Sequence, residues 1–190
     1  AYKFKINNNL KDTAAIFLLN EILGGSSSSR LFRDLREQEK LCYHVKSKYS
    51  ITDDIGVLSL KIGTTTDNKE TGEIHFDNVK KSIDGFNKHV NKMKSERVTD
   101  EELSNAKLTL KNNLFSNHQS AYDKIDTLIN TVDTPYGVNK ENSLIEEIDN
   151  ITAEDIQNAA NYIFSTKPTY SILATADTLK ANEEFLNSLK

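Results

Sequence analysis

Residues 14–43 read AAIFLLNEILGGSSSSRLFRDLREQEKLCY, and this stretch decides the fold. Ala14 to Leu23 is apolar on nearly every side, which predicts a deeply buried helix. Gly24-Gly25 is expected to end that helix, because glycine accepts the left-handed geometry of a helix C-cap. One of the serines that follow is expected to cap a second helix over residues 30–39. The stretch therefore predicts two helices joined by a tight corner.

Alternating side chains predict strands on both sides of these helices. Residues 2–6 alternate apolar and polar side chains, which indicates a half-buried strand. Residues 41–51 alternate as well, and the alternation assigns Tyr43 to the same face as Val45. A second alternating stretch over residues 57–65 completes a hairpin, so these two strands are expected to be antiparallel.

Helical periodicity and capping signals predict most of the remaining chain. The clearest signal is an apolar stripe from Phe76 to Met93, with steps of three and four residues. The other predicted elements are a helix starting at a capping box at Thr99, a helical stripe from Tyr122 to Val132, a short helix over residues 144–148, a helix starting at Thr152, a strand over residues 170–175 and a helix after Asp177. The pattern predicts an α+β fold: a two-layer sandwich of a mainly antiparallel sheet with helices packed on one face. We expect one domain over residues 1–190.

Composition excludes several classes of protein. Charged residues make up 27% of the 190 residues and the net charge is −4, whereas nucleic-acid-binding domains usually carry a basic face. The longest apolar stretch, Ala14 to Leu19, is too short to cross a bilayer. Cys42 is the single cysteine, so an internal disulfide is impossible and a reducing compartment is favoured. We therefore expect no nucleic acid partner, no membrane partner and a cytoplasmic location. The chain begins at Ala1 without a methionine, which suggests a piece of a longer protein.

The four histidines do not predict a metal site. A helical zinc site needs two histidines and a glutamate on one helix face, as in His-x-x-Glu-His, and the sequence holds no such motif. His75 and His89 share a predicted helix but lie about 21 Å apart along its axis at about 1.5 Å per residue. We expect His44, His75, His89 and His118 to be solvated surface residues, and we expect no cofactor in this chain.

Two other groupings allow more than one interpretation. Cys42 and His44 would point to the same face of one strand, about 7 Å apart, which suits a packed cysteine better than a nucleophile pair. The Gly24-to-Ser29 segment could cradle an anion on free N–H groups at a helix start. It lacks the Gly-Lys-Ser/Thr ending of a P-loop, so a tight corner between helices is the plainer interpretation.

Arg36 and Tyr43 are candidate binding residues. They lie seven positions apart, at the end of the second helix and the start of the next strand. Because the chain folds back between them, a guanidinium and a phenol could emerge on one side of the sheet. Such donors suit a peptide carbonyl or a developing oxyanion. The alternative is that Arg36 is a surface charge at a helix C-terminus and Tyr43 packs in the core.

The sequence resembles a known family over essentially its whole length. Residues 19–25 (LNEILGG), 29–32 (SRLF), 35–37 (LRE) and 41–43 (LCY) resemble the second, non-catalytic half of pitrilysin/insulinase-type zinc metallopeptidases, a superfamily that includes mitochondrial processing peptidase subunits and the core proteins of the cytochrome bc1 complex. Residues 98–103 (VTDEEL) also fall where that half would have them.

The resemblance implies a role within a larger peptidase. Enzymes of this type pair two similar α/β halves around a closed chamber, with zinc in the first half. The resemblance implies that Tyr43 holds the scissile carbonyl as it becomes an oxyanion, and that Arg36 grips the substrate backbone. It also implies that the Gly-Gly-Ser corner lies near the chamber entrance or the partner half. The implied partners are a catalytic N-terminal half, or a homologous subunit, and a peptide substrate; zinc belongs to the catalytic half.

Three hypotheses follow. The first is the substrate-binding half of a zinc metalloendopeptidase, inactive by itself because it lacks the zinc motif. The second is a structural scaffold of the same fold, which has no need of the Arg36–Tyr43 pair. The third is an unrelated small-molecule-binding module that uses the Gly-Gly-Ser corner; it predicts an internal pocket within the single domain rather than a concave polar face.

Overall fold

The computed structural model describes residues 1–6, 9–52, 54–66, 71–74, 76–116, 122, 125, 129 and 139–189. The helix expected from Tyr122 to Val132 therefore lies largely outside the described residues, as do His75 and His118. Of that helical stripe, Tyr122, Ile125 and Ile129 are described, and their side chains are exposed.

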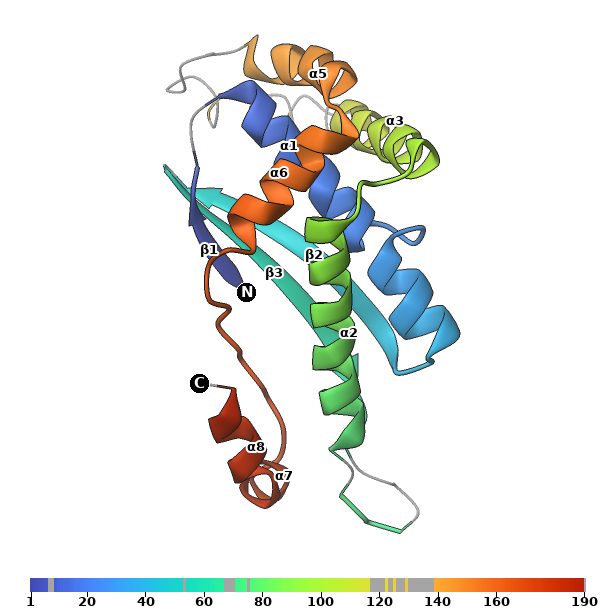
Figure 1. The fold of residues 1–190 in the computed structure, drawn as a ribbon, viewed down its shortest axis with the longest axis vertical. Helices are drawn as coiled ribbons and strands as arrows, with labels where there is room; N and C mark the ends of the chain where they lie inside the picture. The colour runs from blue at the N-terminus through green and yellow to red at the C-terminus, as the bar shows by residue number, and fades with distance from the viewer. Residues whose placement is uncertain are drawn as a thin grey trace.

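One antiparallel sheet forms the first layer of the molecule (Figure 1). Its strands are β1 (Tyr2–Lys5), β2 (Cys42–Thr52) and β3 (Ile55–Thr64), arranged in the order β1-β3-β2. The hairpin predicted over residues 41–65 is thus confirmed, with Val45 opposite Ile62 and Lys46 opposite Lys61. Strand β1 pairs with β3 from Ile55 to Leu58.

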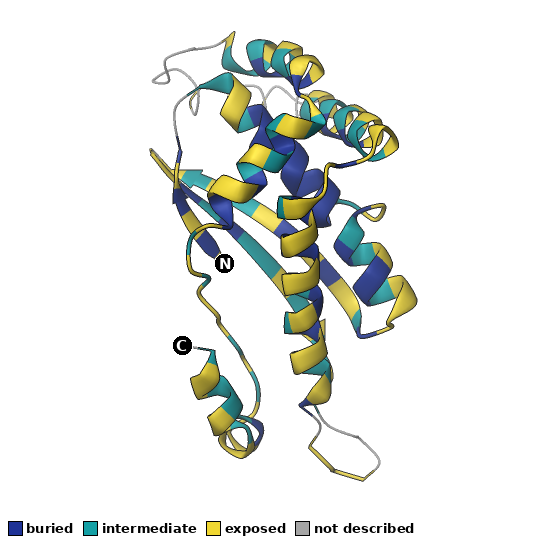
Figure 2. Cartoon of the chain, in the orientation of Figure 1, coloured by how far each residue is buried: buried dark blue, intermediate teal, exposed yellow. Residues whose placement is uncertain are grey.

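Helices cover one face of this sheet, and the predicted α+β sandwich is confirmed (Figures 1 and 2). Among the described residues the helices are α1 (Leu10–Asn20), the π-helices η1 (Glu21–Gly25) and η2 (Phe32–Gln38), α2 (Asp77–Ser95), α3 (Asp100–Ser116), α5 (Lys140–Asn150), α6 (Ala153–Ile163), α7 (Ala176–Ala181) and α8 (Glu183–Ser188). η1 and η2 pack on β2, α2 packs on β3, and α6 packs on β1. Helix α1 contacts α5 and α6.

The core lies between the sheet and these helices. Its fully buried side chains are mostly leucine and isoleucine; they include Leu18, Leu19, Leu23, Leu31, Leu35, Leu58, Ile148, Ile156 and Ile163. Each strand sends alternate residues into this core, as the burial pattern of β1 shows. The apolar residues between positions 14 and 23 are part of this core. They are apolar on nearly every side because the sheet and the neighbouring helices surround this segment.

The predicted capping box at Thr99 is confirmed, and the structure shows a second one at Thr152. Glu102 N donates to Thr99 Oγ1 at 3.1 Å and Thr99 N donates to Glu102 Oε2 at 3.0 Å at the start of α3. Thr152 and Asp155 repeat the arrangement at the start of α6. These reciprocal bonds satisfy N–H groups that have no partner within the helix.

The glycine pair ends its helix for a different reason from the one predicted. Neither Gly24 nor Gly25 has a positive φ, so no left-handed cap forms. A Cβ on Gly24 would lie 2.5 Å from the backbone nitrogen of Ser47 on β2. The glycine is therefore required because η1 approaches the sheet backbone closely. Ser47 Oγ completes this contact by donating to the Asn20 carbonyl at 3.0 Å.

The expected serine cap of the second helix is not the arrangement observed. Ser29 Oγ donates to the Ser26 carbonyl at 2.6 Å, and the Ser29 carbonyl accepts from Arg33 N at 3.0 Å. The Ser29 hydroxyl thus closes the corner rather than accepting a helix N–H.

The strand predicted over residues 170–175 is wrong. Residues 167–175 have no regular structure, and Thr169 exchanges two hydrogen bonds of 2.8 Å each with Ala1, the residue before β1. Leu173 is 99% exposed. The alternating pattern favours an extended chain, but an extended chain becomes a strand only with a partner ladder beside it. The helix predicted after Asp177 is present as two short helices, α7 and α8.

Candidate functional site

Helix η2 and the turn after it carry the candidate site. In η2 the N–H groups bond one residue further back than in an α-helix, as Glu39 N to the Asp34 carbonyl at 2.8 Å shows. Lys40 then adopts a left-handed φ of 54°, and Leu41 N donates to the Leu35 carbonyl at 2.9 Å. This turn reverses the chain, so Arg36 at the end of η2 lies beside the first residues of β2.

Tyr43 lies at an irregularity of the strand ladder. Cys42 pairs with Thr64 and His44 pairs with Gly63, so Tyr43 is an extra residue between them, as in a β-bulge. Val45 is buried, whereas Tyr43 is 87% exposed. The alternative that placed Tyr43 in the core is therefore wrong, whereas the face that Tyr43 was predicted to share with Val45 stays a prediction.

The structure brings the two candidate residues together. The guanidinium carbon of Arg36 lies 5.3 Å from the centre of the Tyr43 ring and 4.4 Å from the centre of the Phe32 ring. Phe32 and Arg36 are one helical turn apart, so the arginine is stacked between an aromatic ring on its own helix and one on the next strand. Cation–π contacts hold the guanidinium in place while its N–H edge keeps access to a ligand.

Cys42 and His44 do not form a nucleophile pair. Burial raises the pKa of the Cys42 thiol, although the charge of Arg36 opposes the shift. A raised pKa keeps the thiol protonated, and the thiolate is the form that attacks. His44 is exposed, as predicted, and lies across the bulge from Cys42.

His89 is a buried residue, and its prediction as a surface histidine is wrong. Its Nε2 lies 2.6 Å from Asp34 Oδ2, and Lys88 Nζ donates to the same oxygen at 2.8 Å. Burial lowers the pKa of His89, while the hydrogen bond to Asp34 opposes that shift. Burial would raise the pKa of Asp34, but the bonds from Lys88 and His89 outweigh it and lower that pKa. The pair joins η2 to α2.

One indirect sign of this burial is present in the sequence. The stripe of apolar residues on α2 is flanked by Ser82, Gly85 and His89, which step by three and four residues and are all buried. A Cβ on Gly85 would lie within the van der Waals distance of Leu35, so a small residue is needed where η2 crosses α2. A histidine in phase with such small residues faces the neighbouring helix rather than solvent.

A second ionic contact holds the start of the η2 region. Arg30 Nε and Nη2 donate to the two carboxylate oxygens of Glu102 at 2.7 and 2.8 Å. The Arg30 hydrogen bonds lower the pKa of Glu102 to about 2, against the smaller opposing effect of burial. Glu102 also belongs to the capping box of α3, so one carboxylate ties the corner to the next layer of helices.

The Gly-Gly-Ser corner is lined by acidic groups. A cavity of about 410 Å³ lies beside it, and its lining includes Glu21, Glu101, Glu102, Ser26 and Arg33. Burial raises the pKa of Glu21, and a hydrogen bond from Ser26 opposes that shift. Three carboxyl groups around one arginine suit an anion poorly, so the corner does not favour the anion-cradle interpretation.

The described residues do not provide the donors of a catalytic zinc site. Within that part of the chain no group of three or more His, Cys, Asp or Glu residues is arranged to hold a metal ion. His44 stands alone on the exposed side of β2, and His89 is committed to Asp34. Nor does any described helix combine the length and apolarity needed to cross a membrane.

Comparison with known proteins supports the resemblance. Residues 1–110 match the model of the family described as the peptidase M16 inactive domain. An uncharacterized zinc protease of Rickettsia felis is 32% identical over 169 residues, which are 89% of this chain and 38% of that protein. The zinc protease YmxG of Bacillus subtilis, also uncharacterized, is 33% identical over 110 residues, 58% of this chain and 24% of that one. The chain thus spans less than half the length of these relatives.

Solved structures share the fold. A protease from Helicobacter pylori matches with a TM-score of 0.66 at 19% identity, covering 86% of this chain and 36% of that one. A peptidase M16 inactive domain from Pseudomonas fluorescens matches with a TM-score of 0.61 at 22% identity, covering 85% of this chain and 38% of that one. At these identities the likeness shows the architecture and nothing finer.

Proposed function

Since the chain belongs to the peptidase M16 inactive domain family, we propose that it is the substrate-binding and chamber-closing half of a zinc-dependent metalloendopeptidase. The catalytic partner would be a separate half, in the same polypeptide or as a homologous subunit, and the substrate a peptide. One observation carries the proposal: the Arg36 guanidinium is fixed between Phe32 and the 87%-exposed Tyr43.

Tyr43 and Arg36 would share the handling of the scissile peptide. The Tyr43 hydroxyl donates a hydrogen bond to the carbonyl oxygen as negative charge develops on it. Arg36 donates from its planar fork to carbonyl groups of the substrate backbone, at a position set by the two rings beside it. Zinc in the catalytic half would supply the attacking water, which no residue of this chain is proposed to activate.

A structural scaffold is the alternative with the same fold. It would explain the buried contacts between η2, α2 and α3, because these hold any such domain together. It offers no reason for an exposed tyrosine on a bulge beside a stacked arginine, whereas bulges are over-represented next to active sites, where they re-aim a side chain. The Arg36–Tyr43 geometry therefore favours the substrate-binding role.

The test is peptide hydrolysis by the full protein that contains this chain. Tyr43→Phe removes one hydroxyl and is expected to lower kcat by about 10²–10³ without altering the fold, as loss of an oxyanion donor does. Tyr170→Phe is the matched control, because Tyr170 lies in the segment between α6 and α7, which runs on the opposite side of α2 from η2 (Figure 1). An unchanged kcat in Tyr43→Phe would remove Tyr43 from the reaction.

Arg36 is tested separately. Arg36→Ala is expected to raise KM for the peptide more than it lowers kcat, because backbone binding is lost in the ground state as well. Arg97→Ala, which removes an exposed guanidinium bonded to Glu154, is the control. The chain alone is expected to show no hydrolysis with added zinc, and activity in the isolated chain would contradict the proposed division of labour.

A further inference from the structure

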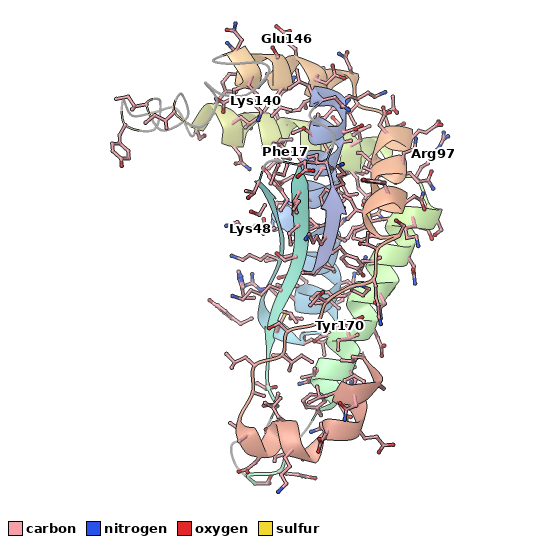
Figure 3. The ribbon with its side chains drawn as sticks, turned by 90° about the vertical axis from the view of Figure 1, so that its left-hand side faces the viewer. Phe17, Lys48, Arg97, Lys140, Glu146 and Tyr170 are labelled. Atoms are coloured by element: carbon pink, nitrogen blue, oxygen red, sulfur yellow. The ribbon has the colours of Figure 1, made fainter. Side chains whose placement is uncertain are left out.

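The sheet has one face that the helices leave open. Along β2 the buried positions are Val45 and Ser47, and the residues between and beside them are exposed. Figure 3 shows the sheet edge-on, with Lys48 on the side away from the helices. This open face is defined here by the outward positions of β1, β2 and β3 and is called the outer sheet face.

Lysines dominate the outer sheet face. They are Lys3 and Lys5 on β1, Lys46 and Lys48 on β2, and Lys61 on β3. The strand register places them on the same side, because Lys46 lies opposite Lys61 and β1 joins β3 in the same antiparallel ladder. No outward strand position in this described part of the sheet holds Asp or Glu. Five positive charges thus gather on one face of a chain whose net charge is −4.

The arrangement does not serve the stability of the sheet. Lys46 and Lys61 are direct cross-strand neighbours, and like charges in that position destabilise an antiparallel pair. A carboxylate at either position would convert the repulsion into an attraction. Of the five lysines only Lys5 has a carboxylate nearby in the described structure, an exposed contact of 3.9 Å with Asp54. Charge of one sign, unpaired on an open face, attracts a ligand of the opposite sign.

We propose that the outer sheet face binds the acidic side chains of an extended peptide, which makes peptides rich in Asp and Glu the substrate class of this protein. This inference rests on the proposed peptide-binding function and deepens it. The proposed reaction site lies at the end of the same strand, since Tyr43 precedes His44 on β2. A peptide lying along β2 would meet Lys48, then Lys46, then the end of the strand that carries Tyr43.

Lysine rather than arginine predicts broad selectivity within this class. An ammonium group on a flexible stem attracts a carboxylate at many distances and angles, whereas a guanidinium fork demands one geometry. The face should therefore select for negative charge rather than for a particular sequence. Because the lysines are exposed, the attraction should weaken at high salt.

The experiment measures peptide binding to the full protein with its metal removed by a chelator, so that no cleavage interferes. The probe is a fluorescein-labelled peptide of alternating Glu and Ser, compared with the same peptide carrying Gln in place of Glu. Fluorescence anisotropy is expected to give about tenfold tighter binding of the acidic peptide at low salt, with the difference lost at about 0.5 M salt.

A triple variant localises the effect. Lys46→Gln, Lys48→Gln and Lys61→Gln together are expected to remove most of the preference for the acidic peptide. The matched control is Lys81→Gln, Lys92→Gln and Lys180→Gln, which removes the same charge from exposed positions on α2 and α7. Because the three sheet lysines are exposed and Lys46 opposes Lys61, the first variant is expected to be at least as stable as the unmodified protein.

Several results would overturn the inference: equal binding of the two peptides, an equal loss in the control variant, or tighter binding of single-stranded oligothymidylate than of the acidic peptide. The last would assign the face to nucleic acid. Failure of the proposed function is distinguishable. If kcat is unchanged in Tyr43→Phe but the acidic peptide is still preferred, Tyr43 has no role in the reaction and the binding face stands. If kcat falls in Tyr43→Phe but the two peptides bind equally, only the binding face is removed.

Discussion

Asp34 and Arg36 are two residues apart on the same short π-helix, yet they meet opposite surroundings. Asp34 points inward, where it bonds to His89 and Lys88 on α2. Arg36 points outward, where two aromatic rings hold it beside an exposed tyrosine. The comparison teaches that one helix can be anchored on one side and present a binding group on the other. Rigid anchoring is what allows an exposed side chain to be placed accurately.

The largest expected effect is a loss of stability when the contact of Asp34 with α2 is removed. Asp34→Ala leaves the buried His89 and the ammonium of Lys88 without their acceptor, and we expect it to lower the free energy of unfolding by about 3 kcal/mol. Asp84→Ala, which removes an exposed carboxylate from α2, the helix that carries Lys88 and His89, is expected to change the free energy of unfolding by less than about 0.5 kcal/mol. Urea denaturation measures both. Equal effects would mean that the inward pair is no anchor.

The contact between Arg30 and Glu102 is expected to contribute less to the free energy of unfolding than the contacts of Asp34. Arg30→Lys keeps the charge but loses one of the two parallel hydrogen bonds, which should cost about 1–2 kcal/mol in the same denaturation assay. Arg97→Lys, at an exposed ion pair with Glu154, is the control and should cost almost nothing. A larger loss at Arg97 than at Arg30 would contradict the assignment of Arg30 as an anchor.

The anchor should also respond to pH. Burial lowers the pKa of His89 in the folded protein below its ordinary value of 6.5. At a pH between the lowered pKa and the ordinary one, the unfolded chain therefore binds more protons than the folded protein. Stability should therefore fall as the pH drops below about 6.5, with a slope of at most about 1.4 kcal/mol per pH unit for one proton. Asp34 stays charged in this window because its own pKa is lowered. Denaturation of His89→Gln at several pH values should show a flatter profile; an identical profile would assign the dependence to another group.

The smallest stability effects are expected on the outward side. Tyr43→Phe should leave the free energy of unfolding unchanged within about 0.5 kcal/mol, because the hydroxyl is exposed and the ring is retained. Its expected cost is in turnover. Thermal and urea denaturation of this variant, beside its kinetics, would sharpen the comparison most. A loss of stability comparable to that of Asp34→Ala would make Tyr43 a structural residue.

Much of the architecture could be predicted from the sequence because it follows from local rules. The hairpin over residues 41–65, the α2 helix and the capping box at Thr99 depend on periodicity and on side chains three residues apart. The resemblance also identified Arg36 and Tyr43, whose proximity the structure confirms. Their roles as substrate contacts stay predictions, as do the single domain over residues 1–190 and the cytoplasmic location.

What could not be predicted depends on contacts between distant segments. Gly24 is needed because of Ser47, which follows it by many residues and approaches it only in the folded sheet. His89 on α2 is buried because η2 packs against that helix and brings Asp34 to it. The bulge at Tyr43 depends on how β2 meets β3, which the pattern of a single strand does not show. The failed strand over residues 170–175 shows a related limit, an extended pattern without a ladder.

The short first strand has a practical consequence. β1 covers β3 only from Ile55 to Leu58, while β3 continues to Thr64, so the described sheet has a flank along which another extended chain can add. Sheets with such a flank can stack chain upon chain in concentrated solution. The isolated chain should therefore aggregate as its concentration is raised. Repulsion among the lysines on the sheet should oppose this aggregation at low salt, and added salt should screen the repulsion.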